Sequence, residues 1–281
     1  MKPVNLRKKI ELFKWSMRKL TLPIYGSGLN LDVGSGGNPH PFADVLLEKY
    51  LDDTHRLKAI KIDRPTVLAD ASKMPFKDKA FEFVFAFHVL EHLHQPAEFL
   101  DEVQRIGKSG YIETPNALYE RIHPFSVHLL EILHVEGTLY IYKKRGPRGD
   151  DFIGQINLLE RDAAWRDFFY SNPRLFHNCY RWNGEIKYKI LNPDVDTNWF
   201  EDPETASTDG HISASLESSF RARFIELLKK FNTKKVDLDS ILACPECKGD
   251  LVREPEHYRC ANGHCGLRYK RNPVPDFNNP V

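Results

Sequence analysis

The segment from Leu29 to Asn38 constrains the fold of this chain more than any other. It reads Leu-Asn-Leu-Asp-Val-Gly-Ser-Gly-Gly-Asn, in which apolar residues alternate up to glycines at positions 34, 36 and 37. This pattern indicates a buried strand that ends in a glycine-rich turn. Glycine suits such a turn because it tolerates positive φ and lets a ligand approach the backbone closely. The pattern is typical of the first βα unit of an open, mostly parallel sheet, which binds nucleotide-like ligands there.

Further strands and a helix follow at the spacing of an α/β fold. Phe81–Phe87 is almost entirely apolar, as is typical of a central strand buried on both faces. A helix is expected to begin near Pro96, with acidic residues in its first turn and Arg105 in its last. Strands that alternate with helical stretches predict a parallel sheet. The other strands are expected at Asp44–Tyr50, Thr66–Asp70 and Gly110–Thr114.

The second half of the chain departs from this alternation. Val127–Val135 and Thr138–Lys144 flank a Glu-Gly dipeptide, so we expect an antiparallel hairpin that closes the sheet. The aromatic-rich segment Leu158–Trp182 is expected to be helical. The remaining expected elements are a strand at Glu185–Leu191, an acidic loop at 192–215, and a helix whose apolar positions are Leu216, Phe220, Phe224, Leu227 and Phe231.

Composition indicates a globular protein. The chain has 281 residues, 41% of them hydrophobic and 28% charged, and its formal net charge is +1. Such a charge argues against binding of polyanions over the whole surface. No apolar run approaches the roughly 18 residues that cross a bilayer, and no signal-peptide core follows the basic N-terminus. We therefore expect a cytoplasmic protein without a transmembrane segment.

The first 20 residues are expected to form a basic amphipathic helix. Its apolar positions recur at helical spacing, and its basic residues lie largely off that stripe. The helix either packs on the edge of the α/β domain or contacts a membrane surface or an anionic substrate. The apolar positions are Leu6, Ile10, Phe13, Met17 and Leu20, and the basic residues are Lys8, Lys9, Lys14, Arg18 and Lys19.

Four of the five cysteines are grouped near the C-terminus, whereas Cys179 stands alone. Two pairs of thiolates on short turns supply four tetrahedral ligands, which predicts a zinc ribbon with a structural Zn²⁺ ion. The second pair is more widely spaced than usual, so His264 is a rival for the fourth ligand position. The expected ligands are Cys244, Cys247, Cys260 and Cys265.

The glycine-rich turn matches neither of two common phosphate-binding patterns. A dinucleotide site needs Gly-x-Gly-x-x-Gly and a phosphate loop needs Gly-Lys-Ser or Gly-Lys-Thr, and both are absent here. Asp32 lies immediately before the turn. A carboxylate there disfavours a pyrophosphate and suits a ligand with a cationic group.

With these residues, the stretch from Leu29 to Lys144 resembles the S-adenosylmethionine-dependent methyltransferases of the Rossmann-like class. Phe87-His88-Val89-Leu90-Glu91-His92 is similar to the type 11 subgroup that includes quinone-biosynthesis O-methyltransferases. The resemblance implies that Glu48 binds the ribose hydroxyls and that Asp70-Ala71 contacts the adenine. The cofactor-binding residues that it implies are Asp32, Gly34, Ser35, Gly36, Glu48, Asp70, Ala71 and His88. Without the resemblance, Asp32 is interpreted as a helix cap, Glu48 as a solvated strand end and Asp70 as a turn residue.

The segment Leu238–Phe277 resembles the small zinc-ribbon activator protein of tRNA and protein methyltransferases. The shared features are the Ala-Cys-Pro-Glu-Cys-Lys-Gly-Asp-Leu motif and the later Pro-Val-Pro-Asp-Phe motif. In that family the ribbon stabilises a methyltransferase partner. Here the resemblance implies a support, or an acceptor-recognition module, within one chain.

Methyl transfer from a sulfonium needs an aligned nucleophile and, for a hydroxyl, a base. The candidate bases are His92, His123 and His128, which alternatively only line a polar cleft. We expect O-methylation of a small-molecule or glycan acceptor, for which the aromatic segment either forms a stacking platform or packs a core. The alternatives are a methyltransferase acting on tRNA or rRNA and a non-catalytic cofactor-binding scaffold.

Four regions are expected. They are a basic helix at 1–20, a cofactor-binding domain at 21–146, a helical accessory region at 147–235 and a zinc ribbon at 236–281.

Overall fold

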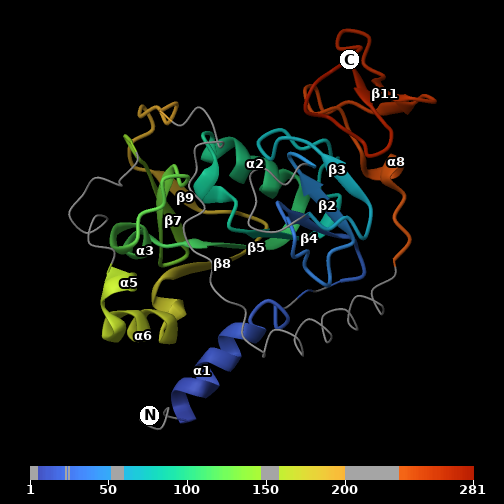
Figure 1. The fold of residues 1–281 in the computed structure, drawn as a ribbon. Helices are drawn as coiled ribbons and strands as arrows, with labels where there is room; N and C mark the ends of the chain where they lie inside the picture. The colour runs from blue at the N-terminus through green and yellow to red at the C-terminus, as the bar shows by residue number, and fades with distance from the viewer. Residues whose placement is uncertain (1–5, 23, 25, 52–59, 147–157, 200–233) are drawn as a thin grey trace.

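A computed structural model describes residues 6–22, 24, 26–51, 60–146, 158–199 and 234–281, and the side chains from position 9 onward. At its centre lies a six-stranded sheet with the order β3-β2-β1-β4-β5-β8 (Figure 1). Strands β1 to β5 are parallel, and β8 is antiparallel to β5. The α/β fold with a mostly parallel sheet is therefore confirmed. The strands are β1 (Asn30–Val33), β2 (Val45–Glu48), β3 (Thr66–Leu68), β4 (Phe81–Phe87), β5 (Gly107–Pro115) and β8 (His177–Asn183).

Short helices connect and flank these strands. Helix α2 begins at the predicted Pro96 and buries Phe99, Leu100, Val103 and Ile106. The described helices are α1 (Leu6–Met17), η1 (Leu90–His92), α2 (Pro96–Ile106), α3 (Ala117–Ile122), α5 (Leu158–Arg161), α6 (Ala163–Ser171), η3 (Pro173–Leu175) and α8 (Leu238–Ile241).

The predicted hairpin forms, but it does not close the central sheet. Strands β6 (Leu130–Val135) and β7 (Thr138–Lys143) pair with each other, and β7 pairs with β9 (Tyr188–Ile190) in a separate three-stranded sheet. The place beside β5 is taken by β8, whose Trp182 packs over Gly110. A Cβ at Gly110 would lie 2.7 Å from Nε1 of that indole, so the glycine makes room for this strand.

The aromatic segment is helical only in its first part, so the prediction of helix up to Trp182 was wrong. After η3 the chain extends as β8, where Asn178, Tyr180 and Trp182 alternate inward. Trp165, Phe169 and Phe176 pack in a small core, in which the Phe169 and Phe176 rings lie 4.4 Å apart. Phe168 and Tyr170 are instead exposed, so only part of the aromatic segment has a core-packing role.

The C-terminal region is a small antiparallel sheet that lies beside β3 (Figure 1). Its strands are β10 (Leu251–Arg253), β11 (His257–Cys260) and β12 (Arg268–Lys270). After β12, the Leu68 amide donates to the Pro275 carbonyl and the Phe277 amide donates to the Leu68 carbonyl, at 2.8 and 2.7 Å. The tail thus covers the outer edge of the central sheet, which would otherwise expose unpaired backbone groups.

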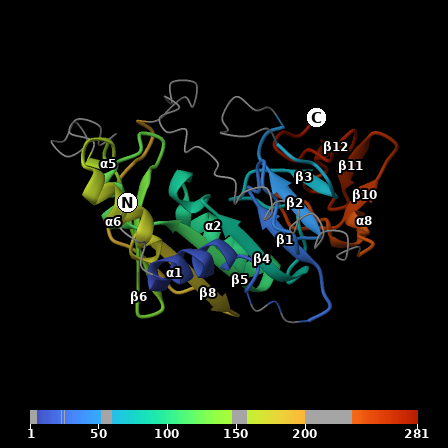
Figure 2. The ribbon, with the colours of Figure 1, turned by 60° about the horizontal axis from the view of Figure 1, so that its bottom comes forward.

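Helix α1 lies near α6 and η3 (Figure 2), where Trp15 meets the ring of His177 at 5.0 Å. The expected apolar stripe is only partly covered, because Ile10 and Phe13 are 45% and 66% exposed. No helix among the described residues is long and apolar enough to cross a membrane. The predicted helix from Leu216 to Phe231 and positions 200–215 of the predicted loop lie outside the described residues.

Candidate active site

The glycine-rich turn lies at the carboxyl end of β1, where the strand order reverses between β1 and β4. Ligands bind at this switch point in open α/β sheets. Gly34 and Gly36 have φ values of +64° and +54°, which glycine adopts without strain. A Cβ at Gly34 would lie 2.7 Å from Cγ2 of Val89, so the turn approaches the segment after β4 closely.

Asp32 is buried at the end of β1. Its Oδ2 accepts a hydrogen bond from the His40 amide at 2.7 Å, and Oδ1 has no partner among the described residues. Burial raises the pKa of Asp32 to about 7, although the His40 amide and Lys19 oppose this shift. A cationic ligand group near Oδ1 would satisfy the unpaired oxygen and favour the carboxylate.

Glu48 ends β2, and Asp70 lies two residues after the end of β3. The buried Glu48 holds the glycine-rich turn, because its Oε1 accepts from Ser35 Oγ at 2.7 Å and from the Gly36 amide at 2.8 Å. Asp70 pairs with Lys49 at 2.8 Å. Although burial opposes it, hydrogen bonds from Lys49 and Ser72 lower the pKa of Asp70. Both acids lie at one sheet edge, as predicted, and their contacts to a cofactor remain a prediction.

His88 follows β4 with a φ of +56°, a conformation that non-glycine residues adopt rarely. Its two ring nitrogens lie 3.3 Å from Glu91 and 3.5 Å from Glu113. Although burial favours the neutral ring, these carboxylates raise the pKa of His88 to about 9. The imidazole is therefore protonated at neutral pH and joins two buried carboxylates.

Glu113 connects the site to the N-terminal segment. Arg18 donates two hydrogen bonds to its carboxylate, at 2.8 and 2.5 Å, and Tyr111 donates a third at 2.8 Å. Burial opposes ionisation of Glu113, but the hydrogen bonds from His88 and Arg18 hold its pKa well below the usual range. The pairing with Arg18 was missed because nothing in the sequence links positions 18 and 113.

The three candidate bases do not form one group. The ring centroids of His92 and His128 lie 4.6 Å apart, and the two rings meet edge to face. His123 instead belongs to an aromatic group with Phe125 and Tyr119, at ring distances of 4.9 and 6.2 Å. The structure thus brings together two of the three, and their catalytic roles remain a prediction.

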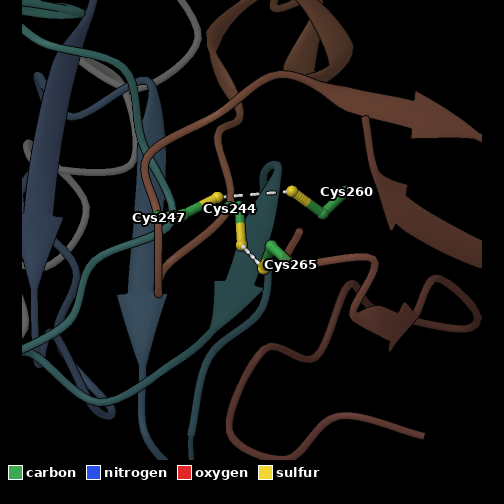
Figure 3. A group of neighbouring side chains, drawn as sticks. All are labelled: Cys244, Cys247, Cys260 and Cys265. Carbon is green, nitrogen blue, oxygen red and sulfur yellow. Dashed lines mark hydrogen bonds between the residues drawn. The ribbon is translucent and has the colours of Figure 1, made fainter. Parts of the chain in front are cut away.

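The four predicted cysteine ligands converge in the C-terminal sheet (Figure 3). The Cys244 and Cys265 sulfurs are 3.7 Å apart, and those of Cys247 and Cys260 are 3.4 Å apart. These separations are too long for a disulfide. They are close to the roughly 3.8 Å edge of a tetrahedron with Zn–S bonds of about 2.3 Å. The exposed His264 is not part of the cluster, so the donor set fits Zn²⁺ with four thiolates.

Residues 31–112 match the model of a protein family described as a methyltransferase domain. This segment contains most of β1, all of β2 to β4 and most of β5, together with the glycine-rich turn. The chain therefore contains an S-adenosylmethionine-dependent methyltransferase domain. The positive-φ glycines and the unpaired oxygen of Asp32 fit a cofactor that carries cationic groups.

Particular relatives cover only part of the chain. An uncharacterized protein of Methanocaldococcus jannaschii is 31% identical over 88 residues, which are 30% of this chain and 41% of the relative. The chain thus spans less than half of that protein.

Solved structures are more distant. The PH0226 protein of Pyrococcus horikoshii is 17% identical, over 53% of this chain and 80% of its own, with a TM-score of 0.32. A methyltransferase of Archaeoglobus fulgidus is 23% identical over 38% of this chain and 53% of its own, with a TM-score of 0.28. A complex of the Haloferax volcanii Trm112 activator with a candidate methyltransferase is 14% identical over 46% of this chain and 73% of its own, with a TM-score of 0.32. At these scores none of the three carries a functional argument.

Proposed function

We propose that this protein transfers the methyl group of S-adenosylmethionine to an oxygen atom of a small-molecule or carbohydrate acceptor. The cofactor would lie over the glycine-rich turn, between Asp32, Glu48 and Asp70. The acceptor would enter at the carboxyl ends of β4 and β5, beside His88 and His92. In this reaction the acceptor O–CH₃ bond forms as the S–CH₃ bond breaks, and the hydroxyl proton passes to a base.

The observation that carries the acceptor class is an acidic segment on this side of the sheet. His94 Nδ1 lies 2.9 Å from Thr197 Oγ1, which holds that segment nearby. That segment exposes Asp194 and Asp196. These charges would repel the phosphates of a nucleic acid.

The C-terminal sheet is inferred to support the methyltransferase domain from within the same chain. Its tail pairs with Leu68, and its Lys248 donates to Glu102 of α2 at 2.8 Å. Both contacts flank the adenine side of the proposed cofactor site, near Asp70. Support of this kind needs a structural metal and no contact with the acceptor.

The test uses the zinc-loaded full chain with methyl-labelled S-adenosylmethionine. Calorimetry first measures cofactor binding, and labelled product is then sought in a metabolite and glycan extract and, separately, in tRNA and rRNA. We expect label in the extract and none with Gly34→Val as the matched inactive control. Label in RNA alone would overturn the acceptor class. Cofactor binding by folded protein without label in any acceptor would favour the non-catalytic cofactor-binding scaffold.

A further inference from the structure

A second group of potential metal ligands lies beside the proposed acceptor site. Glu91 and His92 come from η1, and His128 precedes β6. One carboxylate oxygen and one nitrogen from each ring all lie within 4.8 Å of one another. The Leu129 amide donates to the Glu91 carbonyl at 2.7 Å, so the backbone holds the two segments together. We propose that these three side chains bind a divalent first-row transition metal ion.

The state of Glu91 is the first support for this site. Its side chain is 1% exposed, yet neither carboxylate oxygen has a hydrogen-bond partner among the described residues. Burying an unpaired carboxylate is costly. The neighbouring buried acids are neutralised, Glu113 by Arg18 and Glu120 by Lys144. Glu91 shares the protonated His88 with Glu113, at 3.3 Å from Oε1, and its Oε2 has no partner among the described residues, so a bound cation would supply one there.

The Nδ1 atoms of the two imidazoles have hydrogen-bond partners of the kind that support metal-binding histidines. His92 Nδ1 lies 3.1 Å from the Val127 carbonyl, and His128 Nδ1 contacts the Glu120 carboxylate. Both acceptors require a proton on Nδ1, which leaves the lone pair of a neutral ring on Nε2. Metal-binding histidines usually donate their other ring N–H to a carbonyl or carboxylate in this way. Lys144 donates to Glu120 at 2.7 Å and fixes that outer partner.

The donor set indicates which metals fit. Two imidazoles and one carboxylate suit Zn²⁺, Fe²⁺ or Co²⁺ and leave coordination positions open. Donor atoms around such an ion lie about 3 to 3.5 Å apart, given bonds of about 2.0–2.2 Å. A modest movement of the three side chains would bring their donor atoms, now within 4.8 Å of one another, to these separations. His92 retains exposed surface, so the open positions can be reached from solvent.

The position of the group suggests what the open positions would take. Val89, which packs against Gly34 of the glycine-rich turn, is two residues from Glu91. The metal would therefore lie next to the methyl donor, where it can orient a pair of neighbouring acceptor oxygens, as in a diol or a hydroxy acid. This role rests on the proposed function, whereas metal binding itself does not.

Binding is tested with Co²⁺ alone on the full chain whose cysteine site is already saturated with Zn²⁺. Calorimetry and visible absorption should show one further equivalent of Co²⁺, without the thiolate charge-transfer bands that exchange at the cysteines would produce. We expect at least tenfold weaker binding for Glu91→Gln and for His128→Gln. The matched control His134→Gln, which changes a histidine on β6 outside the group, should bind as the wild type does.

Melting curves give a second readout. Co²⁺ should raise the midpoint of the wild type and of His134→Gln, and should leave both ligand variants unchanged. Lack of a second equivalent, or equal binding by His128→Gln and wild type, would overturn the site. Failure of methyl transfer with intact Co²⁺ binding would count against the proposed function and leave the metal site standing.

Discussion

Glycine at position 34 meets two requirements at once. Its φ is +64°, and a Cβ would come within 2.7 Å of Val89. We expect Gly34→Val to abolish binding of S-adenosylmethionine, measured by calorimetry, while the cysteine site keeps its zinc ion. The control is Gly137→Val in the β6–β7 turn, where φ is +77° and no atom lies within 4 Å of the added Cβ. Equal cofactor affinity in both variants would contradict the role given to the turn.

Asp32 predicts a pH dependence of stability. Its folded-state pKa of about 7 exceeds the value of 3.8 expected in the unfolded chain, because the carboxyl is buried. Between these values the folded protein holds a proton that the unfolded chain has lost. The contribution of Asp32 to the free energy of unfolding therefore falls as pH rises, by about 1.4 kcal/mol per pH unit at most.

The measurement compares Asp32→Asn with wild type by urea denaturation at pH 5 and pH 8. We expect the variant to gain stability relative to the wild type as the pH rises, since the amide carries no charge at either pH. If the difference in free energy of unfolding between Asp32→Asn and wild type were the same at both pH values, the carboxyl of the folded protein would already be ionised at pH 5.

Among the elements, α1 is attached by a buried ion pair at its C-terminal side. Removing Arg18 would leave the buried Glu113 with only His88, at 3.5 Å, as a cationic partner, and breaking a buried ion pair costs about 3–5 kcal/mol in comparable proteins. We expect Arg18→Ala to lower the free energy of unfolding by about that much. The pair of Lys14 with Glu11 lies on the surface, and Lys14→Ala should change stability little. Similar losses in both variants would mean that Arg18 contributes no more than a surface charge.

Local sequence patterns predicted the elements that depend on neighbouring residues. The five parallel strands and α2 follow from apolar spacing and turn residues, and the cysteine ligands follow from their own spacing. The pairing of β8 with β5 could not be predicted in this way, because it depends on the fit of Trp182 over Gly110. The association of His128 with Glu120 and Lys144 likewise depends on how α3, the turn before β6 and the end of the β6–β7 hairpin meet.

At the scale of the whole molecule, the C-terminal sheet shares a hydrophobic core with the methyltransferase domain. Tyr269 and Phe277 belong to the same buried cluster as Phe76. We expect Cys244→Ser to lose zinc and to lower the melting temperature of the whole chain in one transition, by on the order of 10 °C. Cofactor affinity per folded molecule should persist.

His264→Ala is the matched control for this experiment. The His264 side chain is exposed and outside the thiol cluster, so the variant should keep its zinc and its melting temperature. Loss of zinc from the His264→Ala variant would indicate that His264 is a zinc ligand after all. A normal melting curve for Cys244→Ser without zinc would exclude a supporting role for the metal.

The pairing of the C-terminal tail with Leu68 determines how the assembly of the two regions responds to dilution. A supporting subunit on a separate chain dissociates when its concentration falls below its Kd. A tethered one experiences a local concentration in the millimolar range for short flexible connections. The stabilising contacts with β3 are therefore independent of dilution and of the abundance of any second protein. A sheet stabilised in this way by its own chain stays assembled at expression levels at which a two-chain complex would separate.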